Sequence, residues 1–399
     1  MRQAYLDHNA TTPLHRGVLE KMLPFFGEHF GNASSTHGPG RKARKAVEEA
    51  REHVARLIGA SPDEVFFTSG GTESDNLALT GAARALRAKG THIITSAIEH
   101  HAVLHCAGHL VKEGFTATIL PVDRHCRVNI EDLEKALNSG TILVSIMHAN
   151  NETGAIQPVE ELAAIAGKRG VLFHTDAVQT AGKLAIDVKA LGVDLLSLSA
   201  HKIHGPKGAG ALYVKKGTPL EPIVFGGAQE EGKRAGTYNV PGIVGLGEAA
   251  RLALTSQSEN SGYMEAMRDE LEEGILDGNF GGIIITEREG RLSNTLSAAF
   301  PGYDNKVLIA CLDDEGIAVS SGAACTADSE NPSHVLSAMG LSKEAARSII
   351  RFSLGSGTSE EDIDYTLGVL RKVLKKLKPG RGSFLVGALS YLRKEKVRG

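Results

Sequence analysis

The sequence predicts an α/β protein with a large domain on a mostly parallel sheet and a smaller α/β domain. From about residue 15 to residue 260, short β-rich apolar runs alternate with longer helix-like segments. This alternation is typical of a parallel sheet with helices on both faces. A chain of 399 residues that is 42% hydrophobic is also long enough for two cores.

The predicted large domain covers residues 15–260. Its strand-like runs are EVFFTS (64–69), THIITS (91–96), ILVSIM (142–147), GVLFHT (170–175) and DLLSLS (194–199). Helix-like segments, including residues 40–59 and 158–170, separate several of these runs. Each strand is therefore expected to return to the same sheet through a helix.

The predicted small domain combines residues 1–14 with residues 261–378. It opens on a charged helix at about 262–277 and has further helices at 305–315 and 360–377. Its strand signals are IIIT (283–286), LSNTLSAAF (292–300), GIAVSS (316–321) and IIRFSL (349–354). The first dozen residues are expected to pack near it or over the functional site.

Residues 379–399 form a basic tail outside both domains. Residues 371–399 hold ten Lys and Arg and one acid, which leaves the rest of the chain near −12. The tail contains SFLVGALSYL (383–392), too short to span a bilayer. A helix docked on a membrane surface or a partner is one reading, and a solvated terminal helix is the other.

Composition excludes several classes of protein. The net charge of −3 provides no overall attraction to nucleic acid or to an anionic membrane. The N-terminus lacks the apolar stretch of a signal peptide, and no apolar run reaches transmembrane length. Four cysteines argue against a disulfide framework and for a reducing compartment. We therefore expect a cytoplasmic protein that does not span a membrane.

Lys202 is the first candidate catalytic residue. It lies in SAHKIHGPKG, where a buried strand-like run ends and a Gly-Pro turn follows. Open α/β sheets place ligand sites at the carboxyl ends of their strands. Desolvation there lowers the pKa of an amine, and a neutral amine can form a Schiff base. The alternative is a lysine that only caps a strand end.

Asp176 and Gln179 follow the strand-like run 170–175. Asp176 precedes Lys202 by 26 residues, about one strand–helix–strand unit. A pyridine ring that serves as an electron sink needs a protonated nitrogen, and a buried Asp can hold that proton. A helix cap is the alternative for the aspartate.

Residues 68–76, TSGGTESDN, follow a strand and open a helix. Gly70 and Gly71 let backbone amides approach a ligand, and Thr72 or Ser74 could cap the helix and present a hydroxyl. The segment is a candidate phosphate cradle, or only a capped helix after a Gly turn. Ser199 and His201 lie two apart, on one face of the same predicted strand, and could add phosphate contacts.

His100 follows strand 91–96 and could stack on a cofactor ring and shuttle protons. A structural histidine is the alternative. His101, His105 and His109 recur at helical spacing beside Cys106, which also permits a zinc site. No HExxH motif accompanies them, so we expect no metal.

Cys325 lies in a polar, Pro-containing loop, where a thiol is chemically available. Cys106 and Cys311 lie in apolar helical segments and are expected to be inert, whereas Cys126 is expected to be exposed. Arg351 is a charge between apolar residues, and a substrate carboxylate or an internal salt bridge would satisfy it.

Together these segments resemble the NifS/IscS-like cysteine desulfurases, in the class-V aminotransferase branch of pyridoxal 5'-phosphate (PLP) enzymes of fold type I. The resemblance runs from residue 5 to residue 355. The motifs are YLDHNATT, TSGGTESDN, EHHA, HANNETG, HTDAVQ, SAHKIHGPKG, KRAGTYNVPG, SSGAACT and IRFSLG. The resemblance implies the aspartate aminotransferase-like fold and PLP as cofactor.

The resemblance also implies a role for each matching residue. Lys202 would bond the cofactor, Asp176 and Gln179 would hold its ring nitrogen and hydroxyl, and His100 would stack on it. The phosphate would be held by Gly71, Thr72, Ser199, His201 and, across a homodimer interface, Thr237. Asn151 would contact cofactor and substrate, and Arg351 the substrate carboxylate. Cys325 would take the sulfur of L-cysteine as a persulfide and pass it to an acceptor such as an iron–sulfur scaffold.

Three residues depart from the family's usual pattern, namely His8, His204 and Ala228. The long polar loop around Cys325 favours the NifS/IscS group over the SufS-like group. Other possibilities remain a selenocysteine lyase or another class-V PLP enzyme and, more remotely, a zinc-binding protein or a non-catalytic scaffold.

Overall fold

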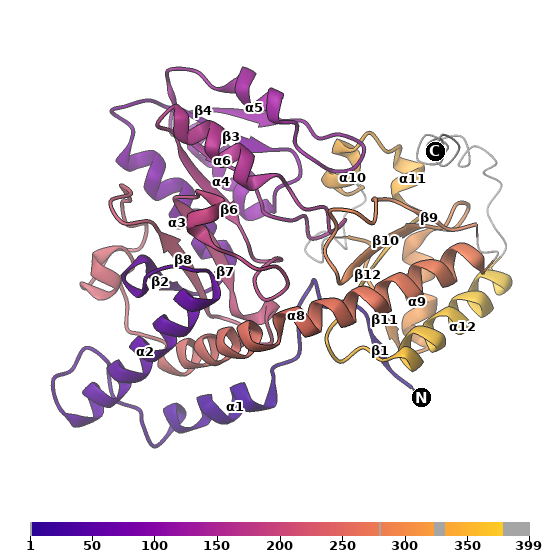
Figure 1. Cartoon of the computed structure of the whole chain (residues 1–399), viewed down its shortest axis with the longest axis horizontal. Helices are drawn as coiled ribbons and strands as arrows, with labels where there is room; N and C mark the ends of the chain where they lie inside the picture. The colour runs from indigo at the N-terminus through magenta and orange to yellow at the C-terminus, as the bar shows by residue number, and fades with distance from the viewer. Residues whose placement is uncertain (1, 279–280, 323–331, 378–399) are drawn as a thin grey trace.

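The computed structural model describes residues 2–278, 281–322 and 332–377. A large sheet with its helices and a second group of smaller sheets lie side by side (Figure 1). The long helix α8 (Val240–Asp277) passes along both groups. The α/β class with a mostly parallel large sheet, predicted from the sequence, is confirmed.

The large sheet has seven strands, and only β8 runs against the others. In spatial order they are β2 (Val65–Thr68), β8 (Gly210–Val214), β7 (Leu195–Ser199), β6 (Leu172–Asp176), β5 (Thr141–Ser145), β3 (His92–Ser96) and β4 (Thr116–Leu120). Every residue of β3, β5 and β7 is buried, as expected for strands covered on both faces. Parallel strands end at one edge, so the side chains that follow β6 and β7 are brought together there.

Most helices of this part cover the two faces of the sheet, whereas the first one in the chain packs against α8. The helices of this part are α1 (Arg16–Met22), α2 (Gly38–Leu57), α3 (Gly71–Ala85), α4 (His101–Lys112), α5 (Ile130–Ala136), α6 (Val159–Lys168) and α7 (Val188–Leu191). Successive strand residues belong to different cores: Leu195 packs with residues of α3 and α4, and Leu196 with residues of α2 and α6. This alternation follows from the period of two along a strand.

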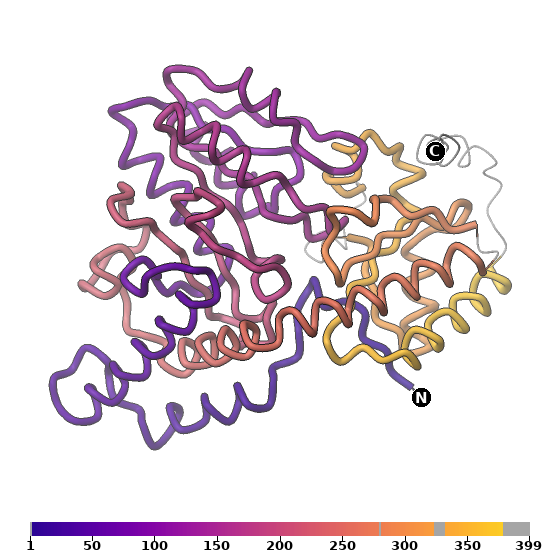
Figure 2. Tube along the Cα trace, in the orientation of Figure 1, coloured from indigo at the N-terminus to yellow at the C-terminus, as the bar shows by residue number. Residues whose placement is uncertain are grey.

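The second group contains two small sheets. The antiparallel one is β12 (Ile349–Ser353), β10 (Thr295–Ala299) and β9 (Ile283–Ile284), and β1 (Ala4–Tyr5) pairs in parallel with β11 (Ile317–Ala318). Its helices are α9 (Asn305–Asp314), α10 (His334–Ala338), α11 (Lys343–Ala346) and α12 (Glu360–Lys376). Figure 2 shows the N-terminal segment running from this group toward the large sheet.

Helix α8 corrects one sequence prediction. The charged helix was expected from about residue 262, but it begins at Val240, where the Asn239 side chain accepts from the Gly242 amide. Glycines weaken the helix signal of the first turns, yet they permit close packing. A Cβ at Gly247 would lie 2.5 Å from the Ala50 Cα of α2. The proposed domain boundary at residues 260–261 thus falls within one continuous helix.

In the part of the chain that the structure describes, no helix has the length and apolar character needed to cross a membrane.

Candidate active site

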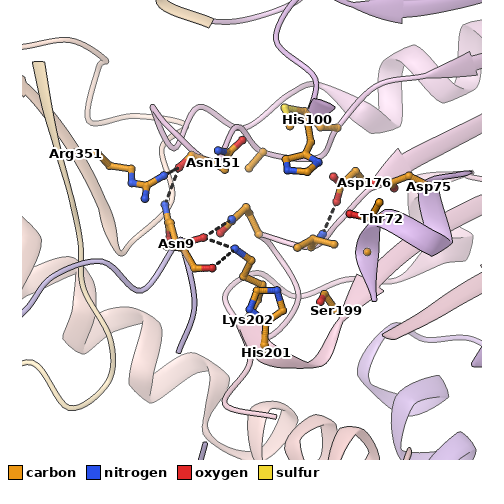
Figure 3. A pocket seen from close by; sticks show the side chains of 16 residues that line it. Asn9, Thr72, Asp75, His100, Asn151, Asp176, Ser199, His201, Lys202 and Arg351 are labelled. Carbon is orange, nitrogen blue, oxygen red and sulfur yellow. Dashed lines mark hydrogen bonds between the residues drawn. The ribbon is translucent and has the colours of Figure 1, made fainter. Parts of the chain in front are cut away.

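A cavity of about 240 Å³ opens at the carboxyl edge of the large sheet (Figure 3). Ten of the predicted site residues line it: Gly71, Thr72, His100, Asn151, Asp176, Gln179, Ser199, His201, Lys202 and Arg351. Thr237 is exposed and is not part of this lining. Cys325 lies outside the described residues.

Lys202 ends a short 3-10 helix, η3 (Ala200–Lys202), that follows β7 directly. Its Nζ donates to the carbonyl of Ala10 at 2.8 Å and to that of Asn9. The N-terminal segment therefore packs over the site and holds the amine. Ser199 and His201 were expected to lie on one face of the same strand, but the strand ends at Ser199 and His201 belongs to η3. Both residues nevertheless line the cavity.

Asp176 is the last residue of β6 and is buried. Its Oδ1 accepts from the amide of Val178 at 2.9 Å. Burial raises the pKa of Asp176, while His100 and Lys202 favour its charged form. A cationic group placed against it would keep the carboxylate ionised.

Asp75 of α3 also lines the cavity, and sequence reasoning missed it. Its side chain is buried, and its Oδ1 has no hydrogen-bond partner in the described structure. Burial and the nearby Asp176 raise the pKa of Asp75. His174 Nε2 lies 3.7 Å from the same oxygen. An acid inside the motif TSGGTESDN was the only signal that could have identified it.

The proposed phosphate end is formed by the first turn of α3. Thr72 or Ser74 was expected to cap this helix, but the capping position is Gly70, with φ of +152°, and no side chain caps the helix. The Ser74 hydroxyl is buried and donates to the Ala211 carbonyl at 3.0 Å, whereas Thr72 lines the cavity. A Cβ at Gly71 would lie 2.8 Å from Val178, so glycine permits this close approach.

His201 and His100 contribute two imidazoles. Burial and neighbouring lysines lower the pKa of His201 to about 4, and its Nδ1 lies 3.1 Å from the Thr11 hydroxyl. His100 caps α4, where its Nδ1 accepts from the Ala102 amide at 3.1 Å. A neutral His100 therefore carries its proton on Nε2. Burial lowers the pKa of His100 and favours this neutral form.

Arg351 of β12 reaches the cavity from the other group of sheets. Its side chain is 1% exposed, and its Nη2 lies 2.6 Å from Oδ1 of Asp7. Nη1 donates to the Asn151 carbonyl at 2.9 Å, and Nε has no partner in the described structure. The internal salt bridge considered from the sequence is thus present, and Arg351 also lines the cavity. Asp7 was not predicted.

Figure 3 shows the arrangement of these groups. Arg351 and Asn151 lie to one side of Lys202, and Asp176 and Thr72 lie to the other. The amine of Lys202 therefore lies between Arg351, which suits a carboxylate, and the buried acid Asp176, which lies near the N-terminus of α3.

The histidines of α4 do not assemble a metal site. The rings of His101 and His105 stack with centroids 4.8 Å apart, and His109 pairs with Glu113 at 3.2 Å. The Cys106 sulfur lies 3.2 Å from the Thr80 hydroxyl. Among the described residues, no three His, Cys, Asp or Glu side chains are grouped so that they could hold a metal ion. The zinc alternative therefore lacks a ligand set in this part of the chain.

The described cysteines include one correction. Cys126 was expected to be exposed but is fully buried, and burial raises the pKa of its thiol to about 12. Cys106 is also buried, and Cys311 is half-buried. The amide of Arg351 donates to the carbonyl of Ser320, five residues before Cys325 in the sequence, at 2.7 Å.

The family described as Aminotransferase class-V matches residues 4–366. The chain is 51% identical to the cysteine desulfurase IscS of Dictyoglomus turgidum, over 94% of this chain and 96% of that protein. It is 46% identical to the IscS of Methanosarcina thermophila, over 94% and 93%.

Two solved structures are similar along nearly their whole length. The first, named a NifS-like protein, has a TM-score of 0.89 and 44% identity, over 94% of this chain and 100% of that one. The second, SspA in complex with cysteine, has a TM-score of 0.80 and 38% identity, over 90% and 100%.

Proposed function

This chain belongs to the class-V aminotransferase family, among its NifS- and IscS-like cysteine desulfurases, and from that premise we propose the following activity. The protein converts L-cysteine to L-alanine and carries the released sulfur as a persulfide on Cys325. The observation that carries the proposal is the meeting of Lys202, Asp176 and Arg351 in one cavity.

The residues of this cavity fit PLP. Lys202 supplies an amine for the aldehyde, and Asp176 a buried carboxylate for the ring nitrogen. The buried Oε1 of Gln179 has no partner among the described residues and can accept from a ring hydroxyl. Gly71 and Thr72 in the first turn of α3 suit a phosphate. When bound, PLP supplies the electron sink that allows the substrate α-proton to leave.

Substrate binding is assigned to Arg351 and Asn151. A guanidinium recognises a carboxylate through two parallel hydrogen bonds. The buried setting of Arg351 strengthens such a contact because water does not compete for it. This anchor orients the amine and the α-proton of cysteine toward Lys202.

Proton transfer is assigned to Lys202 and His100. Lys202 accepts the α-proton when its Nζ is neutral, and later returns a proton to the product. His100 is neutral and holds its proton on Nε2. It can therefore donate a hydrogen bond to negative charge that develops on the reacting groups, although its ring carries no positive charge. Asp176 would hold the protonated ring nitrogen of the bound cofactor, and that positive charge would keep its carboxylate ionised.

Sulfur transfer is assigned to Cys325. Its thiolate attacks the substrate sulfur, so an S–S bond forms as the C–S bond breaks, and alanine leaves after protonation of its carbon. The persulfide is then available to a sulfur-acceptor protein. By resemblance, an iron–sulfur scaffold is the expected acceptor.

We also propose a cytoplasmic homodimer. Phe26, Phe30 and Phe225 are 64%, 78% and 79% exposed, which is unusual for large apolar side chains unless a partner covers them. Exposed Thr237 would then complete the phosphate site of the other subunit. Light scattering on the purified protein tests this: a monomer mass at working concentration contradicts it.

The activity is tested by incubating the purified, PLP-loaded protein with L-cysteine and a thiol. Equal amounts of alanine and sulfide are the expected products. Formation of pyruvate or of an oxo acid instead of alanine would overturn the proposal in favour of a lyase or a transaminase.

A further inference from the structure

A second cavity of about 370 Å³ adjoins the first and shares Lys202 with it. It lies among the N-terminal segment, the residues after η3, the middle of α8 and the residues after β12. Its lining includes His8, Lys183, His204, Leu252, Ala253 and Met264. A cavity of this size is within the usual range for small-molecule ligands.

One end of this cavity is basic. Lys183 is buried, and its Nζ donates to the Gln179 carbonyl at 2.9 Å, which uses one of its three donors. Burial, and to a smaller extent nearby Lys202, lowers the pKa of Lys183 to about 7. None of the described lining residues is acidic. A buried amine without a carboxylate nearby is a site where an anion would be stabilised.

Two imidazoles lie at the same end. His8 and His204 have ring centroids 6.3 Å apart. The Nδ1 of His8 lies 3.1 Å from the Ser353 carbonyl, and that of His204 lies 3.0 Å from the Pro13 carbonyl. Carbonyl oxygens only accept, so both Nδ1 atoms are donors, and Nε2 is the nitrogen left for a ligand. Burial lowers both pKa values, that of His8 to about 4, and a bound anion would favour their protonation.

The rest of the wall is mostly apolar. Leu252, Ala253 and Met264 come from α8. Ile203 and Leu354 are contributed by other segments of the chain. Two of the hydroxyls nearby are already engaged, since Ser256 donates to the Leu252 carbonyl and Thr255 to the Arg251 carbonyl. This part of the cavity suits a short hydrocarbon group better than a polar one.

We infer that this second cavity binds a small organic carboxylate. Its charged group lies at Lys183, His8 and His204, and its short apolar body packs against Leu252, Ala253 and Met264. An amino acid fits less well, because its ammonium group would have no carboxylate partner among the described lining residues. The ligand class is therefore a simple aliphatic acid and not the amino-acid substrate assigned to Arg351.

Calorimetry on the full-length PLP-loaded protein tests this inference with butyrate as the probe. Butyrate should bind saturably, and the uncharged isostere butyramide should not. In Lys183→Met the affinity for butyrate should fall at least about tenfold, because a charge-assisted hydrogen bond is lost. Lys189→Met, which removes an exposed lysine of α7, is the matched control and should bind butyrate like the wild type.

A further variant separates this cavity from the proposed substrate site. Butyrate should still bind to Arg351→Gln. If Arg351→Gln no longer binds butyrate while Lys183→Met does, butyrate binds at Arg351 and the inference is wrong. Equal binding of butyrate and butyramide, or no saturable binding by the wild type, would also overturn the inference.

Anomalous scattering from crystals of the wild type soaked in bromide gives a test without a variant. A bromide peak beside Lys183 that disappears on adding butyrate is the expected result. A peak that butyrate leaves unchanged, or no peak in this cavity, would contradict a carboxylate site.

Discussion

Asp7 and Arg351 form an ion pair at 2.6 Å although 344 residues separate them in the chain. Asp7 also forms a backbone bridge with Ser353, so the N-terminal segment lies along β12 where Arg351 points into the cavity. One side of the guanidinium is therefore held before substrate arrives. A preoriented guanidinium loses less entropy when it binds a carboxylate.

Asp7→Asn should raise the KM for cysteine about tenfold while kcat changes much less, because Arg351 loses the charged partner that holds one side of its guanidinium in position. Steady-state kinetics of alanine formation measures both constants. Asp7→Glu should partly restore the KM. An unchanged KM in Asp7→Asn would show that the pair only stabilises the fold.

Lys202→Ala should abolish turnover and the visible absorbance band that borohydride bleaches. Lys202 is the only lysine among the described residues lining this cavity, so no other amine there can replace it. Absorbance and alanine assays on the purified variant measure the effect. Turnover near the wild-type rate would make the assignment wrong.

Asp176→Asn should retain PLP but lose at least about 100-fold in kcat, because a neutral amide cannot stabilise a protonated ring nitrogen. The fold should persist, since the amide oxygen can still accept from Val178. Bound cofactor is quantified after denaturation, and kcat from alanine release. A wild-type rate with PLP bound would refute the electron-sink role.

Acid should destabilise the protein partly through His174. Burial lowers its pKa from 6.5 to about 3, and its two ring nitrogens lie 2.8 Å from Ser145 Oγ and 3.0 Å from Ser197 Oγ. Below pH 6.5 the unfolded state binds a proton that the folded state excludes. The free energy of unfolding should therefore fall by up to about 1.4 kcal/mol per pH unit from this residue as the pH drops toward 3.

His174→Gln should reduce that slope by about the same amount in urea titrations at pH values between 6 and 4. His174→Asn, which also lacks a titratable group at this position, should show the same reduced slope. A slope that is identical in wild type and His174→Gln would exclude His174 as the group responsible.

Much of the site could be predicted because catalytic side chains follow strands at one edge of a parallel sheet. Lys202 and Asp176 come directly after apolar runs, and such positions are recognisable in one sequence. The family assignment made from the quoted motifs is confirmed. The roles of individual residues stay predictions.

What could not be predicted depends on contacts between distant parts of the chain. Nothing near Asp7 indicates its pairing with Arg351, and nothing near Asp75 indicates its burial beside Asp176. Cys126 was misjudged because His125 and Arg127 are polar, whereas a left-handed backbone with φ of +67° accompanies its burial. The start of α8 was missed because glycines that serve packing resemble loop residues.

Cys325→Ser separates sulfur transfer from cofactor chemistry. Cysteine should still bind and change the visible spectrum, because this requires Lys202, Asp176 and Arg351 but not the loop thiol. Sulfide and alanine production should be lost, since a serine hydroxyl is not ionised near neutral pH and is a poor nucleophile toward sulfur. A variant that keeps full desulfurase activity would show that another group accepts the sulfur.

Mass spectrometry of the wild-type protein after incubation with cysteine locates the sulfur directly. An added mass of about 32 Da is expected on the peptide that contains Cys325. Cys106 and Cys126 should carry none, because both are buried and burial raises their thiol pKa values, which leaves little reactive thiolate. Half-buried Cys311 is the internal control, since it is more accessible yet is not part of the described cavity lining. Sulfur found on Cys311 and not on Cys325 would mean that accessibility alone, and not placement beside the substrate, decides which thiol is modified.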